Sequence, residues 1–506
     1  MNGAEGEIRR RVDEVLNRWP TAGLAVGTVR DGSLSWFHGH GVADLEASTP
    51  ITEDTVFRIA SITKTFTAIA IMQLSEQGLV DLDAPAGDYL RAYRLVPGKP
   101  GLRQPTLREL LTHTAGVRAV RGPSDLLRPA LGWGAPVGQA PALADYYRRG
   151  LRFDVEPGTK WAYSNHGFAT LGQVVEDVSG LAFDRYLRER IFEPLGMASS
   201  DLVRSERLRP RLATGYELRS GGLKPAADRE IVTAGASGVY STISDMARYV
   251  SALLAGGANQ HGSVLKPETL ATMLEPHHQP DPRLPGIGLG FFRDQLGDHR
   301  TVGHDGIWHG FRTDMVLAPD AGVGVLAFAN SGWFDPRGAP TPVADALLRH
   351  LLDVPDDAIR GDVPERPEVW SELCGFYSFG PGALCDPQPR MFLGPGVEVA
   401  VRRARLMIRG QMPIPAIRRG LRLHPDPDDP YVFQIDLSAL GAGIASVVFS
   451  RAPDGEVAAL HTSLSPTSLR KRPRVRNPRR WAIGALAAGA AAIAARRRVA
   501  KAADGL

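Results

Sequence analysis

Ser61 and Lys64 are the pair of residues whose types and spacing point most directly to chemistry. A serine hydroxyl attacks a carbonyl carbon when a nearby base takes its proton and hydrogen-bond donors receive the oxyanion. In Ser61-Ile62-Thr63-Lys64 the two residues are three positions apart and share one face of a helix. The N-terminus of that helix also stabilises negative charge. The pair indicates nucleophilic acyl transfer; an N-cap serine beside a solvated lysine is the alternative interpretation.

Spacing by itself does not single out this pair, because Ser263 and Ser468 also have a lysine three positions later. Ser263 lies just before Pro267, which is the better start of a helix, and Ser468 borders a basic tail. Only Ser61 heads an amphipathic pattern, which predicts a helix over residues 61–78. Lysine is also rare in this arginine-rich chain, and arginine stays protonated and cannot act as a base. We therefore take Ser61 as the candidate nucleophile.

A second motif is Tyr163-Ser164-Asn165, the only Tyr-x-Asn in the sequence. It closes a turn-rich loop over residues 156–165 and precedes a helix predicted over 168–179. A buried structural tyrosine is the alternative interpretation.

The third motif is His304-Asp305-Gly306, the only His-x-Gly, inside a glycine-rich segment that precedes a predicted hairpin. A glycine-rich strand edge lets a substrate approach backbone N–H donors, as an oxyanion hole requires. Glycines that only form turns are the alternative.

These three motifs occur in the order and wide spacing of the serine β-lactamase-like family, and the sequence resembles that family. The family includes class C β-lactamases, DD-peptidases, D-aminopeptidases and family VIII esterases. Segments 57–60, 107–116 and 234–242 resemble it as well, and the resemblance extends over roughly residues 10–350. It implies a β-lactamase/transpeptidase-like domain, in which an antiparallel sheet is flanked by helices and accompanied by an all-helical region.

The resemblance also implies a role for each motif residue. Ser61 would be the nucleophile, and Lys64 and Tyr163 would accept its proton and return it to the leaving group. The choice of base stays open, because a lysine base needs a pKa well below about 10.4 and a tyrosine beside Lys⁺ can fall below about 10. The remaining roles are Asn165 holding Lys64 and the substrate, His304 and Gly306 lining the opposite wall, and the N–H groups of Ser61 and Ile307 as oxyanion donors.

Two departures from the family pattern narrow the expected substrate. Where β-lactamases carry Lys-Thr-Gly to hold the drug carboxylate, this chain has His304-Asp305-Gly306, whose histidine charge depends on its pKa. Residues 1–20 are charged and lack the apolar core of a secretory signal, so we expect a cytoplasmic location, which disfavours a DD-peptidase. We predict a serine hydrolase that forms an acyl-enzyme with a small-molecule ester, amide or peptide. The alternatives are a β-lactamase or DD-peptidase, or a catalytically inactive binding module.

Metal and cofactor chemistry has little support in the sequence. A zinc site could recruit His113, His166, His304 and His309, but no His-Glu-x-x-His is present. The two cysteines form no Cys-x-x-Cys pair, and no Gly-x-Ser-x-Gly supports an α/β-hydrolase. We therefore expect neither a metal nor a cofactor.

An α+β fold is predicted from the elements that surround the motifs. Asp31-Gly32 joins two apolar runs into an early hairpin over 24–37, and a late hairpin is predicted over 315–328. Helical patterns lie between them at 61–78, 168–179 and 244–255. Strands at both ends with helices between them favour an antiparallel sheet whose first and last strands meet.

Composition divides the chain into four parts. We expect a hydrolase domain over 1–355, a Pro- and Asp-rich linker over 356–369, a small β-rich domain over 370–469 and a basic, Ala-rich tail over 470–506. Short strand-like runs at 397–401, 406–408 and 447–449 indicate the β-rich domain.

The basic charge of the protein belongs to the tail. Residues 470–506 carry a net charge of +10, which leaves −6 on the rest, so the body gives no electrostatic reason to expect nucleic-acid binding. An Ala-rich apolar run over 481–495 would reach about 22 Å as a helix, short of the roughly 30 Å hydrocarbon core of a membrane. We expect a flexible tail or surface helix with weak membrane-surface contact at most.

Overall fold

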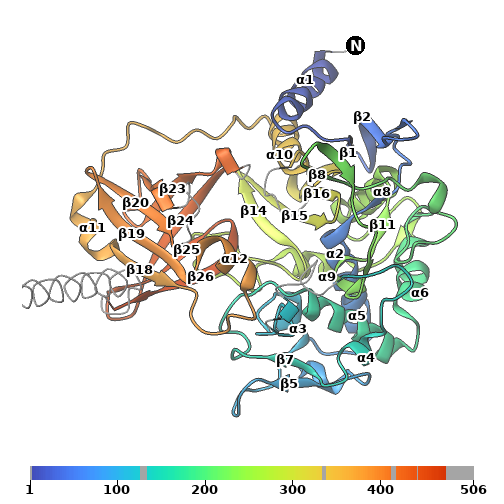
Figure 1. The fold of residues 1–506 in the computed structure, drawn as a ribbon, viewed down its shortest axis with the longest axis horizontal. Helices are drawn as coiled ribbons and strands as arrows, with labels where there is room; N and C mark the ends of the chain where they lie inside the picture. Colours follow the sequence, from blue (N-terminus) through green and yellow to red (C-terminus); the bar gives the residue numbers. More distant parts are fainter. Residues whose placement is uncertain are drawn as a thin grey trace, which may run out of the picture.

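The computed structural model describes residues 3–122, 124–125, 134–332, 338–411, 418–440 and 443–473. A seven-stranded antiparallel sheet forms the centre of the larger unit (Figure 1). Its strands, in spatial order, are β14 (Phe292–Leu296), β15 (His299–Trp308), β16 (Phe311–Ala318), β17 (Val323–Ala329), β1 (Gly23–Arg30), β2 (Ser33–Asp44) and β3 (Thr49–Pro50).

Strand β1 pairs antiparallel with β17 from Leu24 opposite Ala329 to Arg30 opposite Val323, so the first and last strands meet as predicted. Both predicted hairpins are present, as β1–β2 and β16–β17. Asp31 and Gly32 have φ values of 53° and 74°, which is the conformation that an Asp-Gly hairpin turn requires. The predicted α+β class and antiparallel sheet are confirmed.

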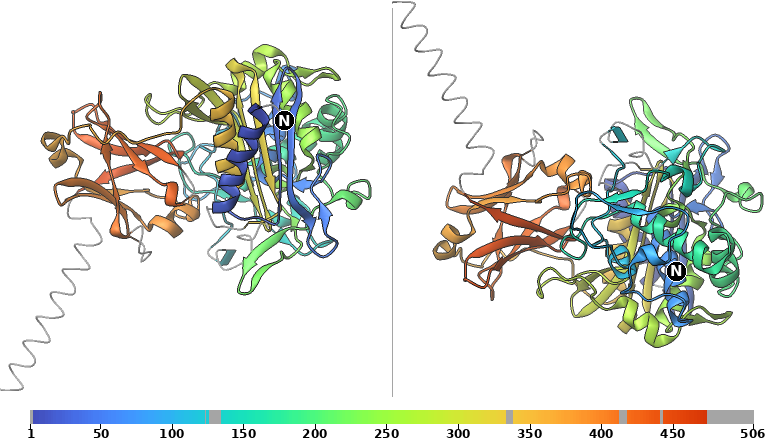
Figure 2. Two further views of the ribbon diagram at one scale, coloured as in Figure 1. Left: turned by 90° about the horizontal axis from the view of Figure 1, so that it is seen from above. Right: turned by 90° about the horizontal axis from the view of Figure 1, so that it is seen from below.

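Helices cover both faces of this sheet. Figure 2 shows α1 (Gly3–Arg18, blue) beside α10 (Pro340–Leu351) on one face, where Ile8, Val12 and Leu16 pack against the sheet. The opposite face carries the main core with α2 (Thr63–Glu76), α5 (Asn165–Ser179) and α8 (Ile243–Leu254). The remaining helices of this unit are short, namely α3 (Leu107–Leu111), α4 (Leu143–Tyr146), α6 (Phe183–Leu187), α7 (Ala234–Ser237) and α9 (Pro267–Leu274).

The predicted helix over 61–78 begins differently from expectation. Residues Ala60–Ile62 form a 3₁₀ turn, η1, and α2 starts at Thr63. Ala60 has a φ of 47°, so the chain bends sharply between the short strand β4 (Phe57–Arg58) and the helix. The other two predicted helices are α5 and α8, capped by the side chains of Ser164 and Thr242.

A second, nine-stranded antiparallel sheet forms the smaller unit. Its edge strand β21 lies against β23 near the opposite edge, so the sheet is almost closed around a core that includes Tyr377, Phe433 and Phe449. The strands are β18 (Gly375–Ser378), β19 (Gly396–Arg402), β20 (Arg405–Gly410), β21 (Leu421–Arg422), β22 (His424–Pro425), β23 (Val432–Asp436), β24 (Ile444–Arg451), β25 (Val457–Thr462) and β26 (Ser465–Arg472).

The limits of this unit differ from the expected 370 and 469. Helix α11 (Pro367–Leu373) buries Val369 and Leu373 in its core, and β26 continues to Arg472 because it pairs with β18. The amino-acid composition changes near these two points, but composition does not reveal that β26 pairs with β18. The rest of the tail, from residue 474, lies outside the described residues. Among the residues that are described, no helix is both long and apolar enough to cross a membrane.

Asp314 in β16 offers a test of the stability of the large sheet. Burial, and secondarily the charge of Asp305 across the ladder, raise the pKa of Asp314 to about 7. Between about pH 4 and pH 7 the folded protein then keeps a proton that the unfolded chain has released, so the free energy of unfolding falls as pH rises. We compare the free energy of unfolding of Asp314→Asn with that of the wild type. We expect this difference to be about 2–3 kcal/mol more in favour of the variant at pH 8 than at pH 5. Urea unfolding at both pH values measures this gain, and an equal difference at the two pH values would contradict it.

Candidate active site

Ser61 and Lys64 are in direct contact. The Lys64 Nζ donates hydrogen bonds to the Ser61 Oγ at 3.0 Å and to the Ala236 carbonyl oxygen at 2.9 Å. Lys64 has no exposed surface, and no carboxylate is among these partners. Burial lowers the pKa of Lys64 well below its usual value, although the charge of Asp305 partly opposes this effect. A buried amine of this kind can hold the neutral form that accepts a proton from Ser61.

Tyr163 also shares a hydrogen bond with the Ser61 hydroxyl. The Lys64 Nζ lies 4.7 Å from the centre of the Tyr163 ring. Burial raises the pKa of Tyr163, and the hydrogen bond from Ser61 only partly offsets that rise. The phenol therefore keeps its proton while the neighbouring amine readily loses one.

His113 holds the loop that carries Tyr163. Its ring centre lies 4.3 Å from that of Tyr163, and its Nδ1 accepts the backbone N–H of Ser164 at 3.1 Å. On the far side, the Phe292 ring stacks on Tyr163 with an interplanar angle of 9°. Sequence reasoning considered His113 only as a zinc ligand and missed this positioning role, because the two segments are far apart in the chain.

Asn165 is the first residue of α5 and is buried. Its Oδ1 has no hydrogen-bond partner among the described residues. The expected contact with Lys64 is not formed, since the hydrogen bonds of the Lys64 Nζ go to Ser61 and Ala236. Asn165 thus brings an unsatisfied acceptor to the site.

The third motif lies on β15, where His304 packs beside the aromatic side chains next to Tyr163. The His304 ring centre lies 4.9 Å from that of Phe292 and 6.2 Å from that of Tyr163. Burial, and secondarily the charge of Lys64, lower the pKa of His304 to about 4, so this histidine is neutral at pH 7. The residue that replaces the lysine of Lys-Thr-Gly therefore carries no charge.

Gly306 lets β15 approach the nucleophile turn closely. A Cβ at this position would lie 2.3 Å from the Ile59 carbonyl oxygen and 2.2 Å from the Thr313 Oγ1. The Thr313 hydroxyl itself donates to the Ile59 oxygen at 3.0 Å. The strand and the turn therefore meet through a glycine because any side chain would separate them.

Ser237 is a residue of the site to which the sequence interpretation assigned no role. Its Oγ lies 3.5 Å from the Ser61 Oγ, and it is buried at the end of α7. The same short helix supplies the Ala236 oxygen to Lys64 and the Gly235 oxygen to Thr67. Segment 234–242 resembles the family in sequence, but the resemblance alone assigns no role to Ser237.

The four histidines considered for zinc serve separate contacts. His166 pairs its Nδ1 with the Tyr147 hydroxyl at 2.6 Å, and His309 pairs with Glu217 at 3.0 Å. His113 and His304 pack on the aromatic side chains beside Tyr163. In the part of the chain that the structure describes, no group of three or more His, Cys, Asp or Glu side chains could hold a metal ion.

The smaller unit contacts the loop that precedes Tyr163. Lys160, three residues before Tyr163, forms a 2.6 Å ion pair with Asp386 and donates to the Pro381 oxygen at 3.0 Å. Phe292 and Thr462 line the same small cavity. The small unit therefore contacts the loop that carries Tyr163.

Sequence similarity to known proteins extends over most of the larger unit. The family model described as Beta-lactamase matches residues 8–349. The chain is 28% identical over 363 residues to unguisins hydrolase ungD' of Aspergillus campestris, which covers 68% of this chain and 64% of that protein. It is 28% identical over 338 residues to a D-aminopeptidase of Brucella anthropi, covering 66% of this chain and 60% of the relative. The match thus spans less than two thirds of either relative.

Among solved structures, the octameric penicillin-binding protein homologue from Pyrococcus abyssi superposes with a TM-score of 0.60 at 22% identity. The superposition covers 93% of this chain and 100% of that one, so it includes the smaller β-rich unit. At 22% sequence identity, this similarity shows only that the two proteins share a fold. Since the family model covers well over half of the 506 residues, the chain belongs to the Beta-lactamase family.

Proposed function

We propose that this protein is a serine hydrolase that forms an acyl-enzyme on Ser61 with an ester or a small amide or peptide. The observation that carries the proposal is the 3.0 Å hydrogen bond between the Ser61 Oγ and the Nζ of a fully buried Lys64. Burial favours the neutral amine, which is the form that can accept a proton. The names of the two relatives, a hydrolase and a D-aminopeptidase, support the same class of reaction.

In the proposed acylation, Lys64 takes the proton of the Ser61 hydroxyl while the Oγ attacks the substrate carbonyl carbon. As the tetrahedral intermediate collapses, the bond to the leaving group breaks and Tyr163 donates its phenolic proton to the departing atom. The proton on Lys64 then passes to the tyrosinate of Tyr163, directly or through a water molecule, which restores both groups. A water molecule repeats the sequence on the acyl-enzyme and releases the acid. The raised pKa of Tyr163 suits a donor, and the lowered pKa of Lys64 suits a base.

The N–H groups of Ser61 and Ile307 are the proposed oxyanion donors. Trp308 and Phe311 flank a two-residue turn, so Ile307 and Arg312 form a non-hydrogen-bonded pair and the Ile307 N–H points away from β16. On that side β14 reaches only as far as Gly303, which leaves the edge beside Ile307 unpaired. An unpaired N–H at this edge can receive the carbonyl oxygen of a substrate.

The uncharged wall at His304 supports an ester or amide over a β-lactam. A β-lactam drug brings a carboxylate to this wall, where His304 is neutral and Asp305 is an acid. A panel of p-nitrophenyl esters, D-amino acid amides, a chromogenic cephalosporin and a D-Ala-D-Ala peptide tests this preference. We expect the best kcat/KM among the esters or amides; faster hydrolysis of the cephalosporin would assign a β-lactamase instead. Absence of both turnover and fluorophosphonate labelling would favour the inactive binding module.

Asp305 should set the pH at which activity is lost on the acid side. Its negative charge raises the pKa of Lys64, so Asp305→Asn removes a stabilising influence on the protonated amine. We expect the acid limb of the kcat/KM profile to move to lower pH by about 0.5–1 unit. Asp298→Asn, an exposed acid in the turn between β14 and β15, is the control and should leave the limb in place. A shift to higher pH would argue against Lys64 as the titrating base.

A cytoplasmic location and weak contact of the tail with a membrane surface are further proposals. They rest on the charged residues of segment 1–20 and on the eleven Lys and Arg residues of segment 470–506. Fractionation of cells that produce the full chain or a chain ended at Pro473 tests the tail. The cut belongs after Arg472, because β26 ends there.

A further inference from the structure

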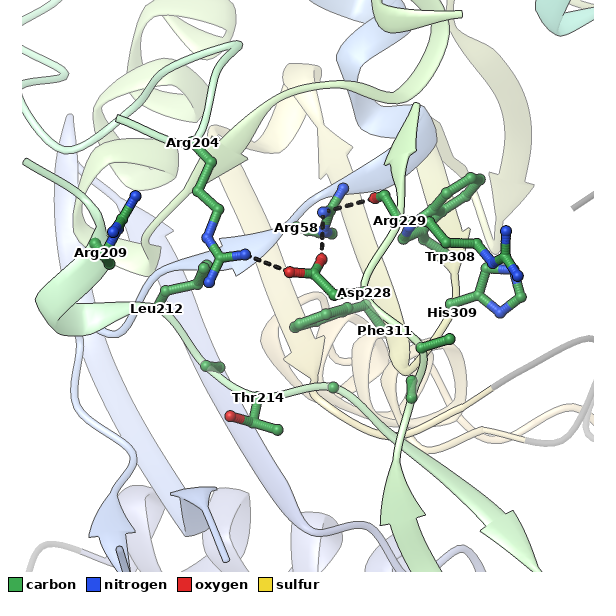
Figure 3. A pocket seen from close by; sticks show the side chains of 14 residues that line it. Arg58, Arg204, Arg209, Leu212, Thr214, Asp228, Arg229, Trp308, His309 and Phe311 are labelled. Carbon is green, nitrogen blue, oxygen red and sulfur yellow. Dashed lines mark hydrogen bonds and ion pairs between the residues drawn. The ribbon is translucent and has the colours of Figure 1, made fainter. Parts of the chain in front are cut away.

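A cavity of about 160 Å³ has four arginines, Trp308 and Phe311 among its lining residues (Figure 3). We call it the arginine pocket. Its walls come from β4, from residues 204–229 and from the turn between β15 and β16. The residues that define it are Arg58, Arg204, Arg209, Arg229, Trp308 and Phe311.

Positive charge exceeds negative charge in the arginine pocket. Asp228 is the one acid among its lining residues, and it already pairs with both Arg58 and Arg204, as Figure 3 shows. Arg209 pairs with Glu206, which is 81% exposed and not part of the lining. The lining thus holds four guanidinium groups and one half-exposed carboxylate, and this excess of positive charge attracts an anion.

Arg229 is the clearest sign that a partner is missing from this pocket. Its Nε is buried without a hydrogen-bond partner, and no ion pair is formed by this residue within the described part of the chain. Its backbone oxygen, in contrast, is used by Arg58 at 2.9 Å. Buried donors are normally satisfied, and a guanidinium matches the planar fork of a carboxylate.

The arginine pocket adjoins the proposed reaction centre through both segments that build it. Arg58 precedes Ser61 by three residues, a span of about 10 Å at most. Trp308 directly follows Ile307, and its side chain packs against Ala60. The backbone of Arg58 therefore lies within about 10 Å of Ser61, a distance comparable to the length of a medium-chain acyl group.

We propose that the arginine pocket binds a terminal carboxylate on the acyl part of the substrate, so that the preferred acyl groups are acidic. This inference rests on the proposed hydrolase function and names its substrate class. An acyl chain of six to eight carbons spans a distance of about 10 Å or less, which matches the reach from Ser61. Trp308 and Phe311 would contact the apolar part of such a chain.

Matched esters test the proposal directly. The mono-p-nitrophenyl esters of adipate and suberate carry the free carboxylate, and their methyl-capped counterparts have the same length without charge. We expect the charged esters to have a kcat/KM at least about tenfold above the capped ones, and Arg229→Gln to reduce this ratio about tenfold or more. Arg185→Gln, an exposed arginine on α6, is the matched control and should leave the ratio unchanged. Equal rates for charged and capped esters in the wild type would overturn the proposal while leaving the hydrolase function intact.

Calorimetry tests anion binding in the arginine pocket separately from the proposed hydrolase function. Suberate and inorganic phosphate are titrated into the Ser61→Ala protein with and without Arg229→Gln. If no ester is turned over but suberate binds and Arg229→Gln weakens it about tenfold, the anion site stands and the hydrolase function falls. If phosphate binds as tightly as suberate, the pocket serves a free anion and the acyl assignment is overturned.

Discussion

Replacing Ser61 with alanine should lower kcat for a p-nitrophenyl ester by about 10⁴-fold or more. The substitution removes the atom that forms the acyl bond, and only the oxyanion donors and substrate binding would continue to accelerate attack by water. Steady-state kinetics measure the loss, and mass spectrometry after fluorophosphonate treatment shows whether the label has disappeared. The change is small and the Ser61 side chain is only partly buried, so the fold should be kept.

The chain supplies its own control for Ser61. Ser263 has the same spacing to a lysine, but its hydroxyl donates to the backbone oxygens of Gly257 and Leu265, remote in sequence from the motif residues. Ser263→Ala should retain full activity and full labelling. Residual activity within tenfold of the wild type in Ser61→Ala, or persistent labelling, would mean that another residue is the nucleophile.

Lys64→Gln should lower the acylation rate by about 10³-fold for every leaving group, because it removes the proposed base. Tyr163→Phe should behave differently. p-Nitrophenolate leaves without a proton, so loss of the Tyr163 donor should cost little with p-nitrophenyl esters and about 10²-fold or more with amides. Burst-phase rates on the two substrate types measure both variants.

Lys266→Gln is the matched control, since Lys266 is the exposed lysine of the second Ser-x-x-Lys pair. Circular dichroism checks that the fold is kept. If Tyr163→Phe abolishes acylation by p-nitrophenyl esters as completely as Lys64→Gln does, Tyr163 is the base and the two proposed roles must be exchanged.

Much of the fold was predictable because its signals are local. Alternating apolar residues and the Asp31-Gly32 turn predicted the first hairpin, and the Pro319-Asp320-Ala321-Gly322 turn predicted the late one. The pairing of β1 with β17 followed from strands at both ends of the large unit. The limits of the small unit were less predictable, since Arg470–Arg472 look like the start of a basic tail and become strand only by pairing with β18.

For the candidate site, the sequence by itself determined the residue types and the order of the three motifs. Ser61 and Lys64 came together because three positions of helical or 3₁₀ chain place them on one face, a property of local geometry. Their position ahead of an apolar helix, followed by Tyr163 and His304, distinguished them from the other two Ser-x-x-Lys pairs.

Only the tertiary structure decided the electrostatics and the neighbours of Ser61. The low pKa values of Lys64 and His304 come from burial, which depends on packing by segments far away in the chain. Ser237, His113 and the arginine pocket are likewise assembled from segments separated by fifty to more than two hundred residues. No local pattern encodes such contacts, because desolvation and charge clustering are properties of the packed interior.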